Sequence, residues 1–198
     1  MPSSWVDVAN TGLTRLGVNP IVSFTDGTRE ANAVNSCYQK CRDITLRLHP
    51  WNCAKTRALL SPDSTAPAFD YPYQFSLPAD WLRALDISSD AAGRDVRLGS
   101  RPRYAIEGKK ILFDSSALYL RYIQRVTDAV QLDETCADAI GAYIAYYLAQ
   151  TFFKNSALTK NMRAQFKDVL ADARSVNAQE QQTSSIPDHF ERVRMGPS

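Results

Sequence analysis

The sequence predicts an α+β protein with a mainly α-helical bundle core, a small antiparallel β insert and an extended C-terminal arm. Apolar residues recur every three or four positions in residues 1–61 and 127–178, which is typical of amphipathic helices. They alternate at every second position in short segments of residues 62–126, whereas residues 179–198 are mostly polar. Because each helical part has one apolar face, we expect the two parts to pack together as one core.

A first helix is expected to begin after Ser3 or Ser4, whose side chains can cap it, and to end at Gly17. A second helix is expected from a cap at Asp26 or Thr28 up to Pro50, which cannot continue it. The apolar face of this second helix includes Ala31, Val34, Tyr38, Cys41 and Leu48.

Trp51 directly follows the predicted end of the second helix. A large aromatic residue at such a break either anchors the helix end in the core or lies at an interface with another protein. If the ring is buried, we expect Trp51→Ala to lower the stability by ~3–5 kcal/mol.

The β insert follows a linker at residues 61–67 that is rich in proline, serine and threonine. Tyr73 belongs to an alternating segment between Pro72 and Pro78, so we expect an edge strand there. Trp81 precedes the next strand candidate, and Gly108 marks a hairpin turn. Further strands are predicted at residues 82–87, 96–98, 104–107, 110–113 and 117–123.

Two more helices are predicted after the insert, one capped by Asp133 and one that begins near Asn155. The short connection between them predicts antiparallel neighbours. The arm of residues 179–198 has too few apolar residues to fold alone, so we expect it to become ordered on a partner. Its candidate contact residues are Ile186, Phe190, Arg192, Val193 and Arg194.

Composition indicates an ordinary soluble domain, with 44% hydrophobic residues, 22% charged residues and a formal net charge of +2. That charge does not by itself indicate a nucleic-acid or membrane partner. The N-terminus lacks the pattern of a secretory signal, and no apolar run approaches the ~18 residues of a membrane span. We therefore expect a protein of a cytosol-like compartment without a membrane partner.

Charge is distributed unevenly, because residues 94–125 have a local net charge of +5. Arg97, Arg101 and Arg103 are the candidate contact residues in this stretch. The stretch is either a surface that meets an acidic partner or DNA, or a solvated sheet face.

The cysteines allow two interpretations. Cys37, Cys41, His49 and Cys53 have the chemistry of zinc ligands, but their spacing differs from the common zinc motifs. Cys37 and Cys41 also lie on the apolar face of a helix, where buried thiols are ordinary. We expect these residues and Cys136 to be reduced thiols, with neither a metal nor a disulfide.

Catalytic motifs are not evident in the sequence. His49 and His189 are the only histidines, and neither lies in a nucleophile–base motif. Glycine-rich phosphate-binding loops are missing, and the sequence predicts no cofactor. The acidic residues close together in sequence, Asp70, Asp80, Asp86 and Asp90, are typical of turns and strand ends.

Several short stretches occur in an order that resembles one known family. They are Leu16-Gly17-Val18 with Ile21 and Ser23, Glu30-Ala31, Arg42-Asp43, Pro50-Trp51-Asn52, Ala54, Arg57-Ala58, residues 73–83 and Tyr146-Tyr147-Leu148-Ala149. This order resembles the tail tubular protein A family of podoviruses, the head-to-tail adaptors of short-tailed phages.

The resemblance implies a structural protein and not an enzyme. It implies a dodecameric ring that binds the portal protein on one side and the tail nozzle, a protein similar to tail tubular protein B, on the other. DNA would pass through the ring without sequence recognition. The expected location is the tail of the virion, assembled in the cytoplasm of the bacterial host.

Two other classes of function remain open. A virion-associated glycan hydrolase would need a groove with two carboxylates ~5–10 Å apart. A basic nucleic-acid-binding protein would bind duplexes in a salt-sensitive way as an isolated subunit.

Overall fold

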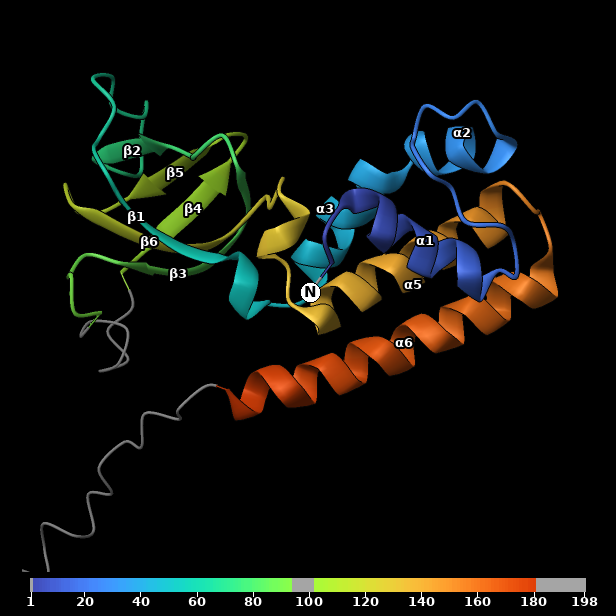
Figure 1. Cartoon of the computed structure of the whole chain (residues 1–198). Helices are drawn as coiled ribbons and strands as arrows, with labels where there is room; N and C mark the ends of the chain where they lie inside the picture. Colours follow the sequence, from blue (N-terminus) through green and yellow to red (C-terminus); the bar gives the residue numbers. More distant parts are fainter. Residues whose placement is uncertain (1, 94–101, 181–198) are drawn as a thin grey trace, which may run out of the picture.

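The computed structural model describes residues 2–93 and 102–180, with the helices gathered at one side and the strands at the other (Figure 1). The helices are α1 (Trp5–Arg15), α2 (Arg29–Asn35), α3 (Tyr38–Leu48), α5 (Glu134–Thr151) and α6 (Ser156–Gln179), with short 3-10 helices η1 (Asn52–Ala54) and η2 (Ala129–Gln131). The strands are β1 (Lys55–Leu60), β2 (Tyr73–Ser76), β3 (Trp81–Ser88), β4 (Tyr104–Glu107), β5 (Lys110–Phe113) and β6 (Leu118–Gln124). The predicted α+β class is confirmed.

Polar side chains cap the helices at the positions that the sequence predicts. Ser4, Thr28, Asp133 and Asn155 each accept a hydrogen bond from a backbone N–H in the first turn of the helix that follows. Such caps satisfy N–H groups that have no partner within the helix. Gly17 has a φ of +70° and ends α1 as expected.

The prediction of one continuous helix up to Pro50 is wrong, because the chain breaks at Ser36 and Cys37 and forms α2 and α3. The Ser36 hydroxyl donates to the carbonyl of Ala33 at 2.7 Å. Cys37 has a φ of −130°, outside the helical region, and α3 begins there without a side-chain cap. Serine competes in this way for backbone acceptors, which makes it a weak helix former.

The strands form two three-stranded antiparallel sheets in the described residues, with the orders β1-β6-β3 and β2-β5-β4. The two sheets share an apolar cluster of Phe75, Ile87, Ile111, Phe113, Leu118, Leu120 and Tyr122. As predicted, β2 is an edge strand and Gly108, with a φ of +57°, lies in the turn between β4 and β5. The strand predicted at residues 96–98 lies outside the described residues.

Residues 55–60, which the sequence analysis placed in the helical core, form β1 instead. This strand pairs with β6 and places Arg57 opposite Arg121. Ala58 and Leu60 face the cluster between the sheets, whereas Leu59 is 63% exposed. An exposed leucine next to buried apolar residues obscures the alternation, and the partner strand comes from a distant part of the chain. The β region therefore begins at residue 55 and not at residue 62.

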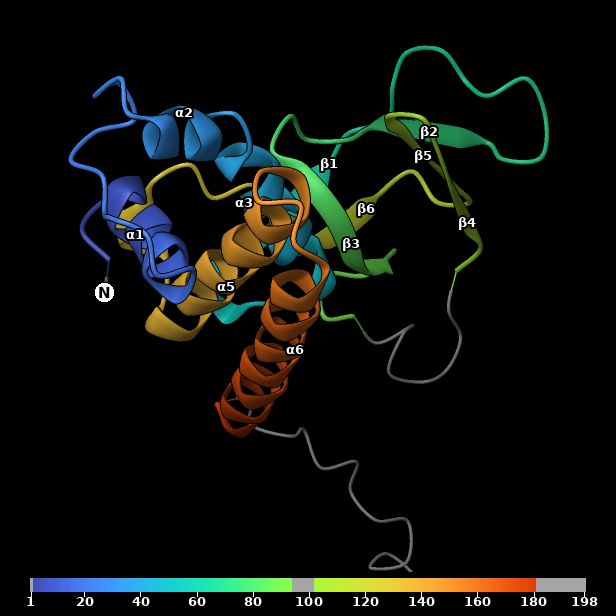
Figure 2. The same ribbon diagram turned by 90° about the vertical axis from the view of Figure 1, so that its right-hand side faces the viewer.

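Helix α5 packs against α1, α3 and α6, and Figure 2 shows it between α1 and α6. The main apolar cluster combines side chains of these helices and of α2 with Leu82 of β3 and Ile123 of β6. The helical and β parts thus share one core. A polar link reinforces this junction, because Arg125 Nε donates to Asp43 Oδ2 on α3 at 2.9 Å.

Candidate functional site

Trp51 is a buried anchor and not an exposed interface residue. Its side chain has 0% exposure, and its indole N–H donates to the carbonyl of Thr45 at 3.0 Å. Thr45 lies in the last turn of α3, where carbonyls have no partner within the helix. The ring also packs edge-on against His49, with 4.9 Å between the ring centroids. The first of the two interpretations of Trp51 is therefore confirmed.

Tyr73 and Trp81 are half-buried and pack against the cluster between the two sheets. Tyr73 lies opposite Phe113 in the β2–β5 pair. Both side chains therefore contribute to the packing of the β part. The other predicted contact residues Arg97, Arg101, Ile186, Phe190, Arg192, Val193 and Arg194 lie outside the described residues.

The cysteines form two pairs instead of one four-residue set. Cys37 hydrogen-bonds to Cys41, and Cys53 hydrogen-bonds to Cys136. The hydrogen bond from Cys37 and burial raise the pKa of the Cys41 thiol, and burial raises that of Cys136. Within residues 2–93 and 102–180, no group of three or more His, Cys, Asp or Glu side chains is placed to hold a metal ion.

The acidic residues that are close in sequence have different partners in the structure. Asp80 accepts a hydrogen bond from the Tyr122 hydroxyl at 3.0 Å, and burial together with this bond raises the Tyr122 pKa to about 12. Asp86 faces Arg121 with 3.9 Å between the charged atoms. Structural roles account for these two carboxylates.

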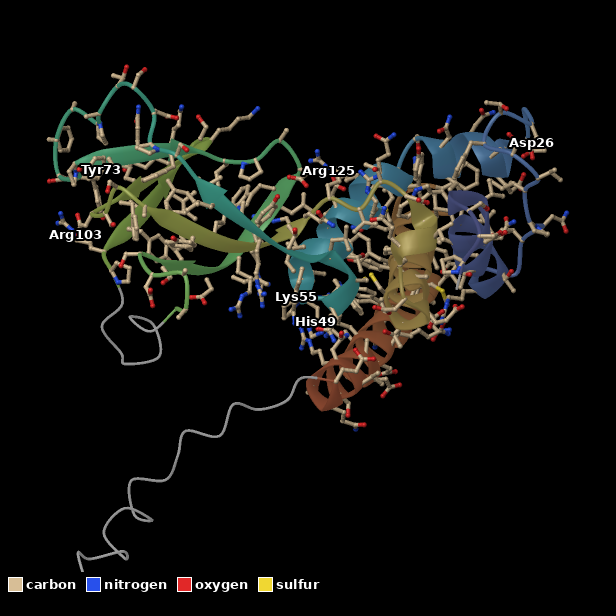
Figure 3. All side chains as sticks on the ribbon, turned by 60° about the vertical axis from the view of Figure 1, so that its left-hand side comes forward. Asp26, His49, Lys55, Tyr73, Arg103 and Arg125 are labelled. Atoms are coloured by element: carbon tan, nitrogen blue, oxygen red, sulfur yellow. The ribbon has the colours of Figure 1, made fainter. Side chains whose placement is uncertain are left out.

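Three basic residues in the described part of the insert each pair with an acidic residue. Arg103 pairs with Asp114, Lys110 with Asp63 and Arg125 with Asp43. Figure 3 shows Arg103 at the far end of the sheets and Arg125 at their junction with the helices. Residues that are neighbours in sequence are thus separated and partly neutralised in space.

The β1–β2 loop, residues 61–72, presents an aromatic residue to solvent. Phe69 is 76% exposed, and the next residue, Asp70, has a φ of +68°. A positive φ is uncommon for residues other than glycine, and aspartate is one of the few that adopts it readily in turns.

Arg103 imposes this shape from the neighbouring strand region. Its guanidinium donates to the carbonyl of Asp70 at 2.6 Å and lies 4.6 Å from the centre of the Tyr71 ring. It also pairs with Asp114 at 3.3 Å. This side chain, which the sequence analysis selected for its charge, therefore holds the loop that presents Phe69.

The first half of the loop is held separately. The backbone N–H of Asp63 donates to the carbonyl of Gln74 at 2.8 Å, and the Gln74 side chain donates to the carbonyl of Thr65 at 2.8 Å. The Asp63 carboxylate accepts from Lys110, and this hydrogen bond lowers the Asp63 pKa. Both halves of the loop are therefore fixed to the second sheet, and the loop is preorganised.

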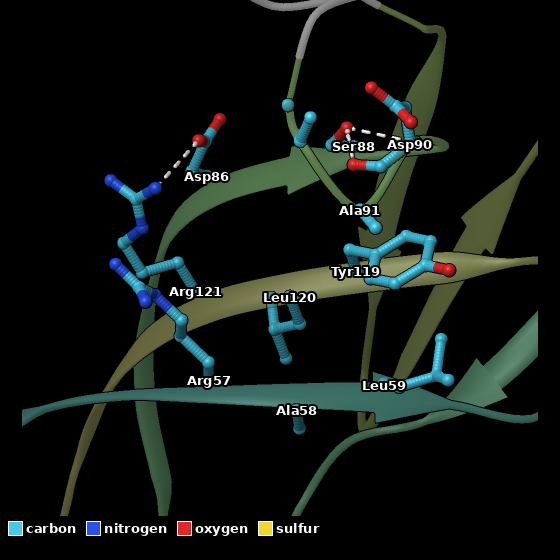
Figure 4. A pocket seen from close by; sticks show the side chains of 12 residues that line it. Arg57, Ala58, Leu59, Asp86, Ser88, Asp90, Ala91, Tyr119, Leu120 and Arg121 are labelled. Carbon is cyan, nitrogen blue, oxygen red and sulfur yellow. Dashed lines mark hydrogen bonds and ion pairs between the residues drawn. The ribbon is translucent and has the colours of Figure 1, made fainter.

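A basic surface that the sequence analysis missed lies on the other sheet. Arg57 of β1 and Arg121 of β6 line one cavity of about 390 Å³ together with Leu59 and Tyr119 (Figure 4). The signal was present in sequence as basic residues two apart at Lys55 and Arg57. The surface could be recognised only from the structure, because the pairing of β1 with β6 places Arg57 next to Arg121.

His49 predicts how stability depends on pH. Burial lowers its pKa below 6.5, and the positive charges of Arg174, Lys55 and Arg83 lower it further, against a smaller opposite effect of Asp133. Unfolding then takes up a proton in the interval between the folded pKa and ~6.5, so the free energy of unfolding falls as the pH drops through this interval.

We expect urea unfolding between about pH 7.5 and pH 5 to show this loss for the wild type and a smaller loss for His49→Gln. The comparison uses the slope of stability against pH, so a constant effect of the substitution cancels. Equal slopes for the two proteins would contradict the assignment to His49.

Within the described residues, no helix has the length and apolar character required to cross a membrane. Comparisons with protein-family models and with curated proteins give no match.

Proposed function

We propose that this protein is a structural adaptor similar to tail tubular protein A, which forms a ring between the portal and the tail nozzle of a short-tailed phage. The observation that supports this most is the preorganised β1–β2 loop with Phe69 at its surface. The order of residues described above supports the choice of family.

An exposed aromatic residue on a fixed loop has the properties of a binding hot spot. Aromatic residues supply a large part of interface energies when they enter a pocket of the partner. Because Arg103 and Lys110 already fix the loop, little conformational entropy remains to be lost on binding.

A second exposed apolar residue lies at the other end of the molecule. Val22 is 91% exposed in the loop between α1 and α2. Figures 1 and 2 place this loop and the β1–β2 loop at opposite ends. A closed ring needs two different surfaces on each subunit, because its contacts are heterologous. The two loops meet this requirement.

The proposal is tested with purified protein, alone and mixed with portal protein, by electron microscopy and sedimentation. We expect rings for the wild type and at least a ~10-fold loss of assembly for Phe69→Ser, which corresponds to about 1.4 kcal/mol of lost contact energy. Val130→Ser is the matched control, because Val130 is also exposed, at 55%, but lies in η2.

Phe69→Ser should melt like the wild type, since the removed ring is exposed. Normal assembly of Phe69→Ser would exclude the loop as the contact. Failure of the wild type to form rings or to bind portal would overturn the adaptor proposal itself. Glycan hydrolysis by the purified protein would favour the enzyme class instead.

A further inference from the structure

The outer face of the β1-β6-β3 sheet, which points away from the second sheet, has three rows of side chains. The registers place Arg57, Arg121 and Asp86 in the middle row. Leu59, Tyr119 and Ser88 form the row on one side. Lys55, Ile123 and Arg83 form the row on the other, where the helices cover Ile123, which is buried in the main apolar cluster. The β3 register shifts between Ala84 and Asp86, which brings Asp86 onto this face.

The middle row contains an unfavourable pair. Arg57 and Arg121 lie directly opposite each other, and Figure 4 shows their side chains next to each other, with the Arg121 guanidinium directed toward Asp86. Like charges in opposite positions of a strand pair destabilise a sheet. Asp86 offsets this only weakly, because it approaches Arg121 to 3.9 Å and the Arg121 side chain is 48% exposed. An anion bound across both guanidinium groups would remove the repulsion.

The positive potential extends beyond these two residues. Burial lowers the pKa of Lys55 and the charge of Arg121 lowers it further, against an opposite effect of Glu180. Arg83 and Arg174 act on His49 at the same end of the sheet. Figure 3 shows Lys55 and His49 close together beside the end of α6. A row of cations therefore continues from the strands toward this helix.

We propose that the outer face of the β1-β6-β3 sheet binds the phosphate backbone of duplex DNA without reading its sequence. Neighbouring strands are ~4.8 Å apart, so the face offers cations at short, regular intervals to the closely spaced charges of a duplex. Its basic side chains outnumber its carboxylates, which are Asp86 in the middle row and Asp90 at the edge of the cavity. That composition suits phosphate oxygens and provides no arrangement for reading base edges.

This inference rests on the proposed function in one respect: the adaptor ring explains why DNA would lie near this face. In a ring around DNA, the face would be turned toward the channel. The binding itself concerns the isolated protein and is measured without any assembly.

The test is fluorescence anisotropy of a labelled duplex with the full chain between about 50 and 200 mM salt. We expect Arg57→Ala/Arg121→Ala to weaken binding equally for unrelated sequences and to reduce the slope of log affinity against log salt by about two. Arg163→Ala/Lys167→Ala on α6 removes the same charge from another exposed surface and should leave the slope unchanged.

Folding of the variant is monitored by its melting temperature. Because the substitution removes a repulsive pair, the melting temperature should stay equal or rise at low salt. Arg57→Gln/Arg121→Gln provides a second variant with longer side chains, for which we expect the same loss of slope.

No binding by the wild type, or the same loss in the α6 control, would overturn the DNA proposal. If the wild type does not bind DNA but the Arg57/Arg121 variant fails to join the portal, the face binds an acidic protein surface and the DNA proposal is wrong. Ring formation is measured separately, so the DNA-binding proposal and the adaptor proposal can fail independently.

Discussion

Trp51→Ala is expected to lower the free energy of unfolding by about 3–5 kcal/mol, the range for removal of a large aromatic side chain from a core. The ring has 0% exposure, so its removal leaves a cavity among residues of α3, α5 and β3 that the core cannot fully close. The carbonyl of Thr45 also loses the indole donor, which leaves the end of α3 with one more unsatisfied acceptor. Both effects act in the same direction.

Trp5→Ala is a matched control, because Trp5 also donates through its indole N–H, to the carbonyl of Thr127 at 2.7 Å, but is only half-buried. We expect this variant to lose about 1–2 kcal/mol, less than Trp51→Ala. Urea unfolding gives both values. A loss below about 1 kcal/mol for Trp51→Ala would contradict the anchor role.

Sequence reasoning located the helix ends well because their causes are local. Ser4, Thr28 and Asp133 cap helices through hydrogen bonds to residues three positions away. Gly17 ends α1 through its own backbone conformation. Such interactions are contained in a short stretch of sequence, so composition and spacing predict them.

The strand β1 and the break between α2 and α3 were missed because their causes are partly distant. Residues 55–60 become a strand by pairing with β6, about 60 positions later in the register. The break at Ser36 and Cys37 divides a stretch whose apolar spacing is continuous, so periodicity alone gave one helix. A distant pairing thus decided the first case, whereas the second depends on a local hydrogen bond of Ser36 that apolar periodicity does not reveal.

The candidate contact residues were also difficult to predict, because their surroundings depend on residues that are distant in the sequence. Local net charge selected Arg103 as part of a basic surface, but the structure uses it to hold a loop through Asp70 and Tyr71. The sequence analysis did not single out Phe69, whose 76% exposure is evident only in the structure. Arg57 and Arg121 become neighbours only through the pairing of β1 with β6.

Gly12→Ala is expected to be the second most damaging substitution, with a loss of about 2–3 kcal/mol, because it adds volume where two helices already touch. A Cβ at this position would lie 2.6 Å from the carbonyl oxygen of Gly141, and a backbone atom cannot move aside as a flexible side chain can. Relief requires α1 to move away from α5, which would loosen contacts of Val8 and Leu13.

The intrinsic helix propensity acts in the other direction, since alanine is better than glycine in a helix by about 1 kcal/mol. The prediction is therefore that steric exclusion exceeds this gain. Gly141→Ala is the control on the facing helix, where the added Cβ meets Thr11 and the Val8 carbonyl at 3.0–3.1 Å. Because these distances are longer than the 2.6 Å at Gly12, a smaller shift relieves the overlap and we expect a smaller loss there. Urea unfolding of both variants decides the order, and a Gly12→Ala protein as stable as the wild type would mean that α1 and α5 pack less closely than described.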